Sequence, residues 1–194
     1  MLLTASLSAA LPLSAASHVD VVKMRTENWV NPLGIGTSTP RFSWQITSDR
    51  KGVVQTSYQI LVASSREKLD RNEADLWDSG ERNSDEQLWI PYQGKALLSG
   101  AQAYWKVRIT TNKGKSEWTE PQLFTIGLLG ETKWSGTWIG LEDLQPGEQK
   151  GMHTRLAARY IRKDFAAKGK VKRALAYVAG LGVYEFYVNG RRMG

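Results

Sequence analysis

The chain has 194 residues, of which 41% are hydrophobic and 23% charged, with a net charge of +7, a globular balance that allows one or two domains. It contains no Cys, which excludes disulfides and cysteine-ligated metal sites, and only two His, His18 and His153. Eight Trp and seven Tyr form a large aromatic set, suited either to a β core or to an exposed surface that faces sugars.

The first 17 residues, MLLTASLSAALPLSAAS, are apolar or small and carry no charged side chain. They are typical of a secretory signal peptide, with small residues at positions 14–16 for cleavage, although Lys and Arg are missing from its start. We therefore expect residues 1–17 to direct export to the periplasm or the extracellular medium. A bilayer-spanning helix needs about 20 apolar residues, so no membrane span is expected.

Residues 19–129 show the period of two that is typical of half-buried strands. In residues 41–47, Phe42, Trp44 and Ile46 share one face. Residues 58–63 are apolar on both faces, which predicts an inner strand, and residues 105–109 alternate apolar with charged side chains. The fold class is therefore predicted as all-β, beginning with a β-sandwich.

The connections between these strands are predicted to be short. Turn-forming residues lie near positions 49–52, 78–80 and 112–115, and residues 65–74 are the only helical candidate, a short surface turn. The stretch LLSGAQAYWKVRITTNKGKSEWTEP resembles the last strands of fibronectin type III domains. It departs from that family at the tyrosine corner, because position 103 is Ala and Tyr104 falls on the opposite face.

Residues 134–194 are predicted to begin a second β domain, in which residues 141–151 form a polar loop that contains Pro and Gly. Three strands are expected, over residues 159–165, 171–179 and 183–188, and Asn189-Gly190 favours a hairpin turn. A unit of this size is marginal by itself. The expectation is an incomplete β-sandwich, cut before its closing strands and lacking the strand that should return after the hairpin turn.

The positive charge is concentrated in this second part. Residues 150–194 hold 11 Lys and Arg against two acidic residues, whereas residues 1–149 hold 15 against 17. A basic segment can bind nucleic acid or an anionic surface. Here the basic residues alternate with strand-like apolar positions, which favours a domain whose balancing acids lie elsewhere, and no nucleic-acid partner is expected.

Several groups of residues have the chemistry of a binding or catalytic site, and each also fits a purely structural role. Trp29, Trp89 and Trp118 can stack on sugars or pack in the protein, whereas Trp44 and Trp105 fit the core face. The acidic residues 73–87 suit a calcium loop or an acid pair, but they lack EF-hand spacing, and such a charge run favours a solvated connection. His153 has no G-x-S-x-G elbow to support a catalytic triad.

An ordered series of segments gives the most specific resemblance. It runs from about residue 21 to the end: MRTENWVNPLGIGTSTPRFSWQI, VVQTSYQILVASS, LWDSGE, YWKVRITTNKGKSEWTEP, WSGTWIG, IRKDF and RALAYVAGLGVYEFYVNGRRMG. This series resembles the N-terminal region of bacterial α-L-rhamnosidases. The resemblance implies an exported, multidomain glycoside hydrolase with a fibronectin type III/immunoglobulin-like first domain (19–129) and a rhamnosidase-type accessory β-sandwich (134–194).

The resemblance also implies where catalysis takes place. Family members remove terminal α-L-rhamnose with inversion, using two carboxyl groups roughly 6.5–9.5 Å apart. These belong to a helical barrel that would follow residue 194, so no catalytic, cofactor-binding or metal-binding residue is assigned here, and no cofactor is expected. Some relatives bind rhamnose through calcium in an accessory sandwich, but none of those ligands can be placed on residues 134–194.

The predicted function is thus a non-catalytic N-terminal portion of an exported α-L-rhamnosidase. This portion would serve domain packing, with carbohydrate contact as a further role. The expected partner is a rhamnose-containing carbohydrate, engaged through the missing domains, and the oligomeric state is left open. The alternative is an autonomous carbohydrate-binding or adhesion module.

Overall fold

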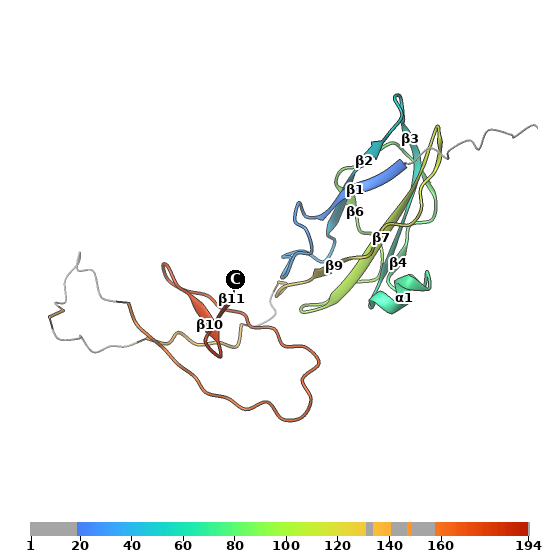
Figure 1. The fold of residues 1–194 in the computed structure, drawn as a ribbon. Coiled ribbons are helices and arrows are strands. Elements are labelled where there is room, and N and C mark those ends of the chain that lie inside the picture. The colour runs from blue at the N-terminus through green and yellow to red at the C-terminus, as the bar shows by residue number, and fades with distance from the viewer. Residues whose placement is uncertain (1–18, 131–133, 141–146, 149–157, 194) are drawn as a thin grey trace, which may run out of the picture. The chain divides into compact units, whose positions relative to one another are not determined.

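The computed structural model describes residues 19–130, 134–140, 147–148 and 158–193. The chain divides into two compact units, Met1–Ser135 and Gly136–Gly194 (Figure 1). The leader predicted for residues 1–17 and the triad candidate His153 lie outside the described residues. In the described part of the chain, no helix is long and apolar enough to cross a membrane.

The first sheet of unit 1 has three antiparallel strands in the order β1-β2-β6. The prediction for residues 41–47 is confirmed, because Phe42 and Trp44 are buried on one face of β2. The register of the edge strand β1 shifts between Val22 and Arg25, and such an irregularity protects an edge from pairing with other chains. The bounds are β1 (Val19–Thr26), β2 (Arg41–Ser48) and β6 (Ile90–Pro91).

The second sheet is built on two long antiparallel strands, β3 and β7. Two short strands, β4 and β5, pair with the outer edge of β3, and β8 and β9 pair with β7, so β3 is the inner strand that was predicted. The bounds are β3 (Gln55–Ala63), β4 (Trp77–Asp78), β5 (Arg82–Asn83), β7 (Gln102–Thr111), β8 (Gly114–Lys115) and β9 (Gln122–Thr125).

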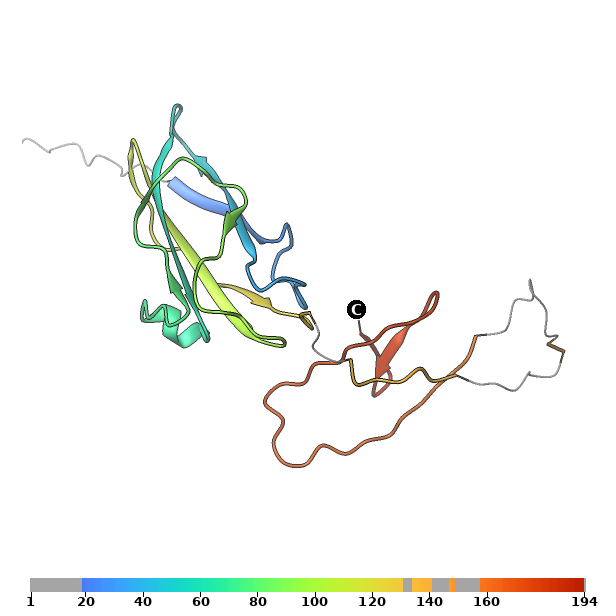
Figure 2. The same ribbon diagram turned by 180° about the vertical axis from the view of Figure 1, so that it is seen from behind.

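The two sheets pack face to face, as views from opposite sides show (Figures 1 and 2). One apolar core joins them, and its centre is the contact between Phe42 of β2 and Trp105 of β7, whose ring centroids lie 4.4 Å apart. Trp44 is also buried and donates from Nε1 to Oε1 of Gln55 at 3.0 Å. The prediction that Trp44 and Trp105 face the core is therefore confirmed, as is the all-β sandwich fold class.

A second, smaller cluster covers the outer face of β3. The five-residue helix α1 (Arg66–Asp70) lies within the predicted segment, begins after the N-cap Ser65, and buries Leu69 against Leu61 and Ala63. Because α1 packs on the outer face of β3, both faces of this strand are buried, which explains why residues 58–63 are apolar on both faces.

Lys106 on β7 corrects the expectation that the charged residues of this strand face solvent. It is only 5% exposed, and its Nζ donates to the carbonyl of Leu69 in α1. Loss of hydration lowers the pKa of Lys106. The Lys106 ammonium and the C-terminal end of α1 thus form a buried contact, which the alternation of apolar and charged residues in 105–109 does not predict.

The departure from the fibronectin pattern at the tyrosine corner is confirmed. Ala103 lies in the core, whereas Tyr104 lies on the outer face and accepts from Nε2 of Gln102 at 2.7 Å. A different buried tyrosine, Tyr92, ties down a loop by donating to the carbonyl of Lys95 at 2.7 Å. Burial, and then the charge of Asp75, raises the pKa of Tyr92 to about 12.

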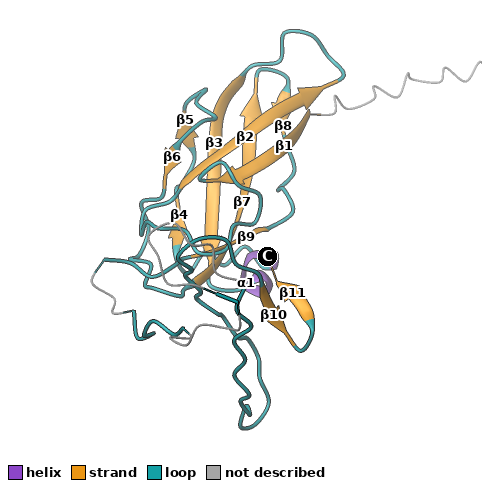
Figure 3. Ribbon diagram, turned by 90° about the vertical axis from the view of Figure 1, so that its left-hand side faces the viewer, coloured by secondary structure: helices purple, strands orange, loops and turns teal. Residues whose placement is uncertain are grey.

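The described part of unit 2 contains one hairpin, formed by β10 (Phe186–Val188) and β11 (Arg191–Met193) (Figure 3). Asn189 and Gly190 have φ values of 50° and 77°, as a type I′ turn requires, so the hairpin prediction is confirmed. The expectation of a missing return strand is wrong, because Phe186 pairs with Met193 and Val188 with Arg191.

Two further strand predictions for unit 2 are also wrong. Residues 159–165 and 171–179 are described, and neither segment is in a strand. A strand needs a neighbour for its N–H and C=O groups. Several large apolar side chains in these segments are exposed, among them Tyr160, Phe165 and Val171, so the apolar pattern there has no partner sheet within the described residues.

Candidate functional site

The connection between β1 and β2, residues 27–40, builds the most distinctive surface of unit 1. It opens with a two-residue turn in which Thr26 and Trp29 exchange backbone hydrogen bonds of 2.9 and 3.0 Å. The two central residues, Glu27 and Asn28, have φ values of 48° and 68°. Asn tolerates this left-handed conformation, but Glu pays roughly 1–2 kcal/mol for it. Other contacts must therefore hold Glu27 in place.

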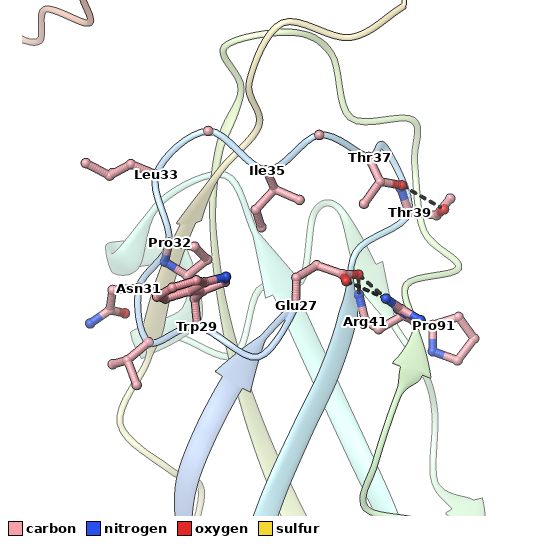
Figure 4. Close-up of a pocket in the computed structure, with 13 residues that line it drawn as sticks. Glu27, Trp29, Asn31, Pro32, Leu33, Ile35, Thr37, Thr39, Arg41 and Pro91 are labelled. Carbon is pink, nitrogen blue, oxygen red and sulfur yellow. Dashed lines mark hydrogen bonds and ion pairs between the residues drawn. The ribbon is translucent and has the colours of Figure 1, made fainter. Parts of the chain in front are cut away.

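Arg41, the first residue of β2, supplies those contacts (Figure 4). The Glu27 carboxylate accepts from the Arg41 backbone N–H at 2.7 Å, from Nε at 3.1 Å and from Nη2 at 2.7 Å. The Glu27 N–H in turn donates to the Arg41 carbonyl at 3.0 Å. The side-chain hydrogen bond is the main cause that lowers the pKa of Glu27 and raises that of Arg41. Both groups are consequently charged at neutral pH.

The indole ring of Trp89 covers one face of the Arg41 guanidinium. The Cζ atom of Arg41 lies 4.2 Å from the centroid of this ring, a cation–π distance. Trp89 has a φ of 60°, and its N–H donates to Oγ of Ser43 on β2 at 3.0 Å. Arg41 is therefore held between a carboxylate and an aromatic face, in one position.

The rest of the loop, residues 31–35, is hydrogen-bonded to β9. Oδ1 of Asn31 accepts from the N–H of Leu123 at 2.8 Å, and the carbonyl of Pro32 accepts from Thr125 at 3.0 Å. Ile35 donates to the Thr125 carbonyl at 2.8 Å and forms an isolated parallel bridge with Ile126. These bonds hold the loop as a frame around an open depression.

This depression has a volume of about 940 Å³ and a mixed lining. Trp29 borders it with a side chain that is 70% exposed, on the Glu27 side in Figure 4. Pro91, the pairing partner of Arg41, lies on the opposite side. Apolar rings thus alternate with a fixed ion pair, an arrangement that can bind a small ligand with both an apolar face and hydroxyl groups. We name Glu27, Trp29, Arg41 and Trp89 the loop-end site.

Two of the three candidate sugar-stacking tryptophans, Trp29 and Trp89, belong to the loop-end site. The third, Trp118, does not, because it packs on the outer face of β7 with Lys106 and Arg108 over its ring at 5.2 and 4.4 Å. Sequence reasoning did not identify Glu27 and Arg41 as site residues. The one signal in the sequence is the Glu27-Asn28 pair between two strands, which is compatible with a tight turn.

The acidic residues 73–87 contribute two short strands to the second sheet. They are more than a solvated connection, because they contain β4 and β5, which pair with β3. Glu81 accepts from the hydroxyls of Ser57 and Thr110, at 2.7 and 3.1 Å. Among the described residues, no group of three or more His, Cys, Asp or Glu is placed to hold a metal ion.

Asp75, in the same segment, is expected to make stability depend on acid pH. Its carboxylate accepts from Ser64 N and Oγ at 2.8 and 2.7 Å and from Lys68 Nζ at 2.6 Å. Burial by itself raises the pKa of Asp75, but the bonds from Lys68 and Ser64 outweigh it and lower the value from 3.8 to about 2. A carboxyl whose pKa is lower in the folded state stabilises that state only while it is ionised.

Asp75→Asn should therefore lower the free energy of unfolding at pH 7 by about 1–2 kcal/mol, allowing for solvent screening at this half-exposed pair. The wild-type advantage should be complete above pH 4–5 and should shrink as the pH falls from 3.8 toward 2. Urea unfolding at pH 7 and near pH 2 measures both values. An equal difference at the two pH values would show that the ionised carboxylate is not the cause.

Comparison with known proteins agrees with this architecture. Residues 21–130 match the family model described as the Rha78A-like, N-terminal immunoglobulin domain. An α-L-rhamnosidase of Formosa agariphila is 36% identical over 179 residues, which cover 84% of this chain and 19% of the relative. An α-L-rhamnosidase of Streptomyces avermitilis is 39% identical over 124 residues, covering 63% of this chain and 12% of the relative.

Solved structures give the same result for the fold. The Streptomyces avermitilis α-L-rhamnosidase complexed with L-rhamnose aligns with a TM-score of 0.59 and 36% identity, over 63% of this chain and 12% of that one. The α-L-rhamnosidase from Dictyoglumus thermophilum aligns with a TM-score of 0.60 and 34% identity, over 64% and 14%. The chain spans about a fifth of the length of the curated relatives with the longest matches. With more than half of its residues matched to the family model, this chain belongs to the family of Rha78A-like N-terminal immunoglobulin domains.

Proposed function

We propose that this chain is the non-catalytic N-terminal portion of an exported α-L-rhamnosidase, an enzyme that removes terminal α-L-rhamnose from glycans or glycosides. The observation that carries the proposal is the match of residues 21–130 to an N-terminal immunoglobulin domain of Rha78A-like proteins, together with curated relatives that are about five times longer. Export through the leader of residues 1–17 is part of the same proposal.

Domain packing is the first role that we propose for unit 1. Large apolar side chains are exposed where the β1–β2 loop meets the end of the domain. Gly100 lies in the turn before β7, and its N–H donates to the carbonyl of Ile126, which bridges to Ile35 in the β1–β2 loop. The turn, the loop and the chain just after β9 therefore lie together. An exposed apolar group of this kind is typical of a protein contact surface. The members of this packing surface are Val30, Leu33, Leu98 and Leu128.

Carbohydrate contact is the second role, and the loop-end site favours it. An exposed indole beside a charged fork suits a sugar ring, whereas an apolar packing surface does not need a fixed ion pair. The same feature supports the alternative function, an autonomous carbohydrate-binding or adhesion module.

A hydrolysis assay tests the non-catalytic assignment. The purified 194-residue chain is expected to release no aglycone from an aryl α-L-rhamnoside above the buffer rate. The Formosa agariphila α-L-rhamnosidase, assayed at the same molar concentration, is the positive control. Turnover by the chain itself, retained through purification to homogeneity, would overturn the assignment.

A further inference from the structure

We propose that the loop-end site binds a neutral pyranose ring, with the exposed ring of Trp29 as the stacking platform and Arg41 and Glu27 as the groups that hold adjacent hydroxyls. The choice of α-L-rhamnose as the sugar rests on the proposed function. The site itself rests on geometry alone, and the two parts of the proposal can fail separately.

The chemistry of a pyranose matches this pair of surfaces. A sugar ring presents C–H groups on one face and hydroxyls around its edge, so it needs an apolar platform beside directional polar groups. Trp29 is 70% exposed and borders the depression. Glu27 and Arg41 are also at its border, and a carboxylate with a guanidinium can accept from one hydroxyl and donate to the next.

The polar part of the site is already organised for binding. Glu27 engages Nε and Nη2 of Arg41, while Trp89 covers the face of the guanidinium. No bond of Nη1 is found among the described residues of the site, and the Arg41 side chain is 48% exposed. A ligand therefore meets a donor whose position is fixed, which removes much of the ordering entropy that binding would otherwise cost.

Backbone strain is concentrated around the same site. Three described residues other than Gly and Asn have positive φ, and two of them, Glu27 and Trp89, lie here. Strained residues persist only where surrounding contacts hold them, and they gather at ligand sites. The contacts that hold these two residues, the ion pair of Glu27 with Arg41 and the bond from Trp89 to Ser43, also fix the position of Arg41 beside the depression.

The charge of the site points to a neutral ligand. Glu27 and Arg41 form a pair at 2.7 Å whose charges cancel at a distance, so neither an anionic nor a cationic ligand gains a net attraction. The remaining lining adds the rings of Pro32 and Pro91 and the hydroxyls of Thr37 and Thr39. The pyrrolidine rings are apolar surfaces of the kind that a sugar methyl group contacts, which is compatible with a 6-deoxyhexose.

Binding to the full chain tests the proposal. Titration calorimetry and two-dimensional NMR of the indole N–H groups would follow methyl α-L-rhamnoside and methyl α-D-glucoside. We expect saturable binding of the rhamnoside with a Kd of about 1–10 mM, as befits a single sugar ring. Among the eight indole signals, those of Trp29 and Trp89 should shift.

Variants distinguish specific binding at the loop-end site from nonspecific binding elsewhere on the chain. Trp29→Ala and Arg41→Lys should each weaken rhamnoside binding by about tenfold, since Lys keeps the charge but loses the planar fork. Trp138→Ala is the matched control, because Trp138 is also 70% exposed, and it should change the affinity less than twofold. Near-ultraviolet circular dichroism would verify that each variant remains folded.

Each outcome decides one part of the proposal. If neither glycoside binds at concentrations of about 50 mM, well above the expected Kd, or if Trp29→Ala leaves binding unchanged, the loop-end site is not a sugar site. Equal binding of the glucoside and the rhamnoside would overturn the assignment to rhamnose. Both results are independent of the hydrolysis assay, so a sugar site that fails leaves the non-catalytic assignment untouched.

Discussion

Replacing Trp105 with alanine is expected to lower the free energy of unfolding by about 3–5 kcal/mol, a large part of the stability of a domain of this size. Trp105 is completely buried at the centre of the core, and its ring lies 4.4 Å from Phe42 on the facing sheet. Alanine would leave a cavity between the two sheets that neither rigid strand can fill. Urea unfolding followed by far-ultraviolet circular dichroism measures the change.

Two variants give this prediction its controls. Trp29→Ala removes the same side chain from an exposed position and should change stability by no more than about 0.5 kcal/mol. Within the described part of the chain, Nε1 of Trp105 has no hydrogen-bond partner, so Trp105→Phe discards an unsatisfied donor and should cost clearly less than Trp105→Ala. Equal effects of Trp29→Ala and Trp105→Ala would mean that the two sheets are not joined through Trp105.

Gly94→Ala is expected to destabilise unit 1 by about 2–4 kcal/mol, through overpacking rather than backbone conformation. A Cβ at position 94 would lie 2.4 Å from Cβ of Trp77, 2.5 Å from the Leu76 carbonyl oxygen and 2.6 Å from Oη of Tyr92. Two of these atoms belong to backbone or to the base of a side chain and cannot move aside. The clash would also disturb the bond from Tyr92 to Lys95 that fixes this loop.

Gly36→Ala is the matched control, because a Cβ at position 36 has nothing within 4 Å. Thermal unfolding of both variants should show a fall in Tm of roughly 8 °C or more for Gly94→Ala and less than about 3 °C for Gly36→Ala. Similar small shifts in the two variants would mean that the loop around Tyr92 relaxes easily, contrary to the close packing described for it.

The sandwich could be predicted from sequence because its strands carry their own signals. Phe42, Trp44 and Trp105 alternate with polar residues, and this period of two fixes which face of each strand meets the core. The same reasoning failed for residues 159–165 and 171–179, where apolar residues are present but no described strand lies alongside them. A strand is stabilised by its neighbours, and a local pattern does not report whether a neighbour exists.

The loop-end site could not be predicted from local sequence patterns, because it depends on contacts between residues far apart in the chain. Trp29 and Trp89 could be singled out as aromatic candidates, but they are 60 positions apart, and their relation depends on Arg41 lying between Glu27 and the Trp89 ring. Neither the left-handed φ of Glu27 nor that of Trp89 is a common choice for its residue type. These conformations are held by tertiary contacts with Arg41 and Ser43 of β2, which no local propensity encodes.

We propose that residues 19–129 are one autonomous sandwich that carries both the fold and the candidate site, and that residues 134–194 are a separate and weaker unit. We propose these boundaries as domain boundaries, and limited proteolysis of the full chain tests them most directly. A resistant fragment of roughly 110 residues that ends near Gly130 is predicted, with residues 134–194 degraded first, because the described residues of that segment are mostly exposed and exposed segments are cleaved first. If residues 134–194 resist the protease as long as residues 19–129, the claim of a single stable unit is wrong.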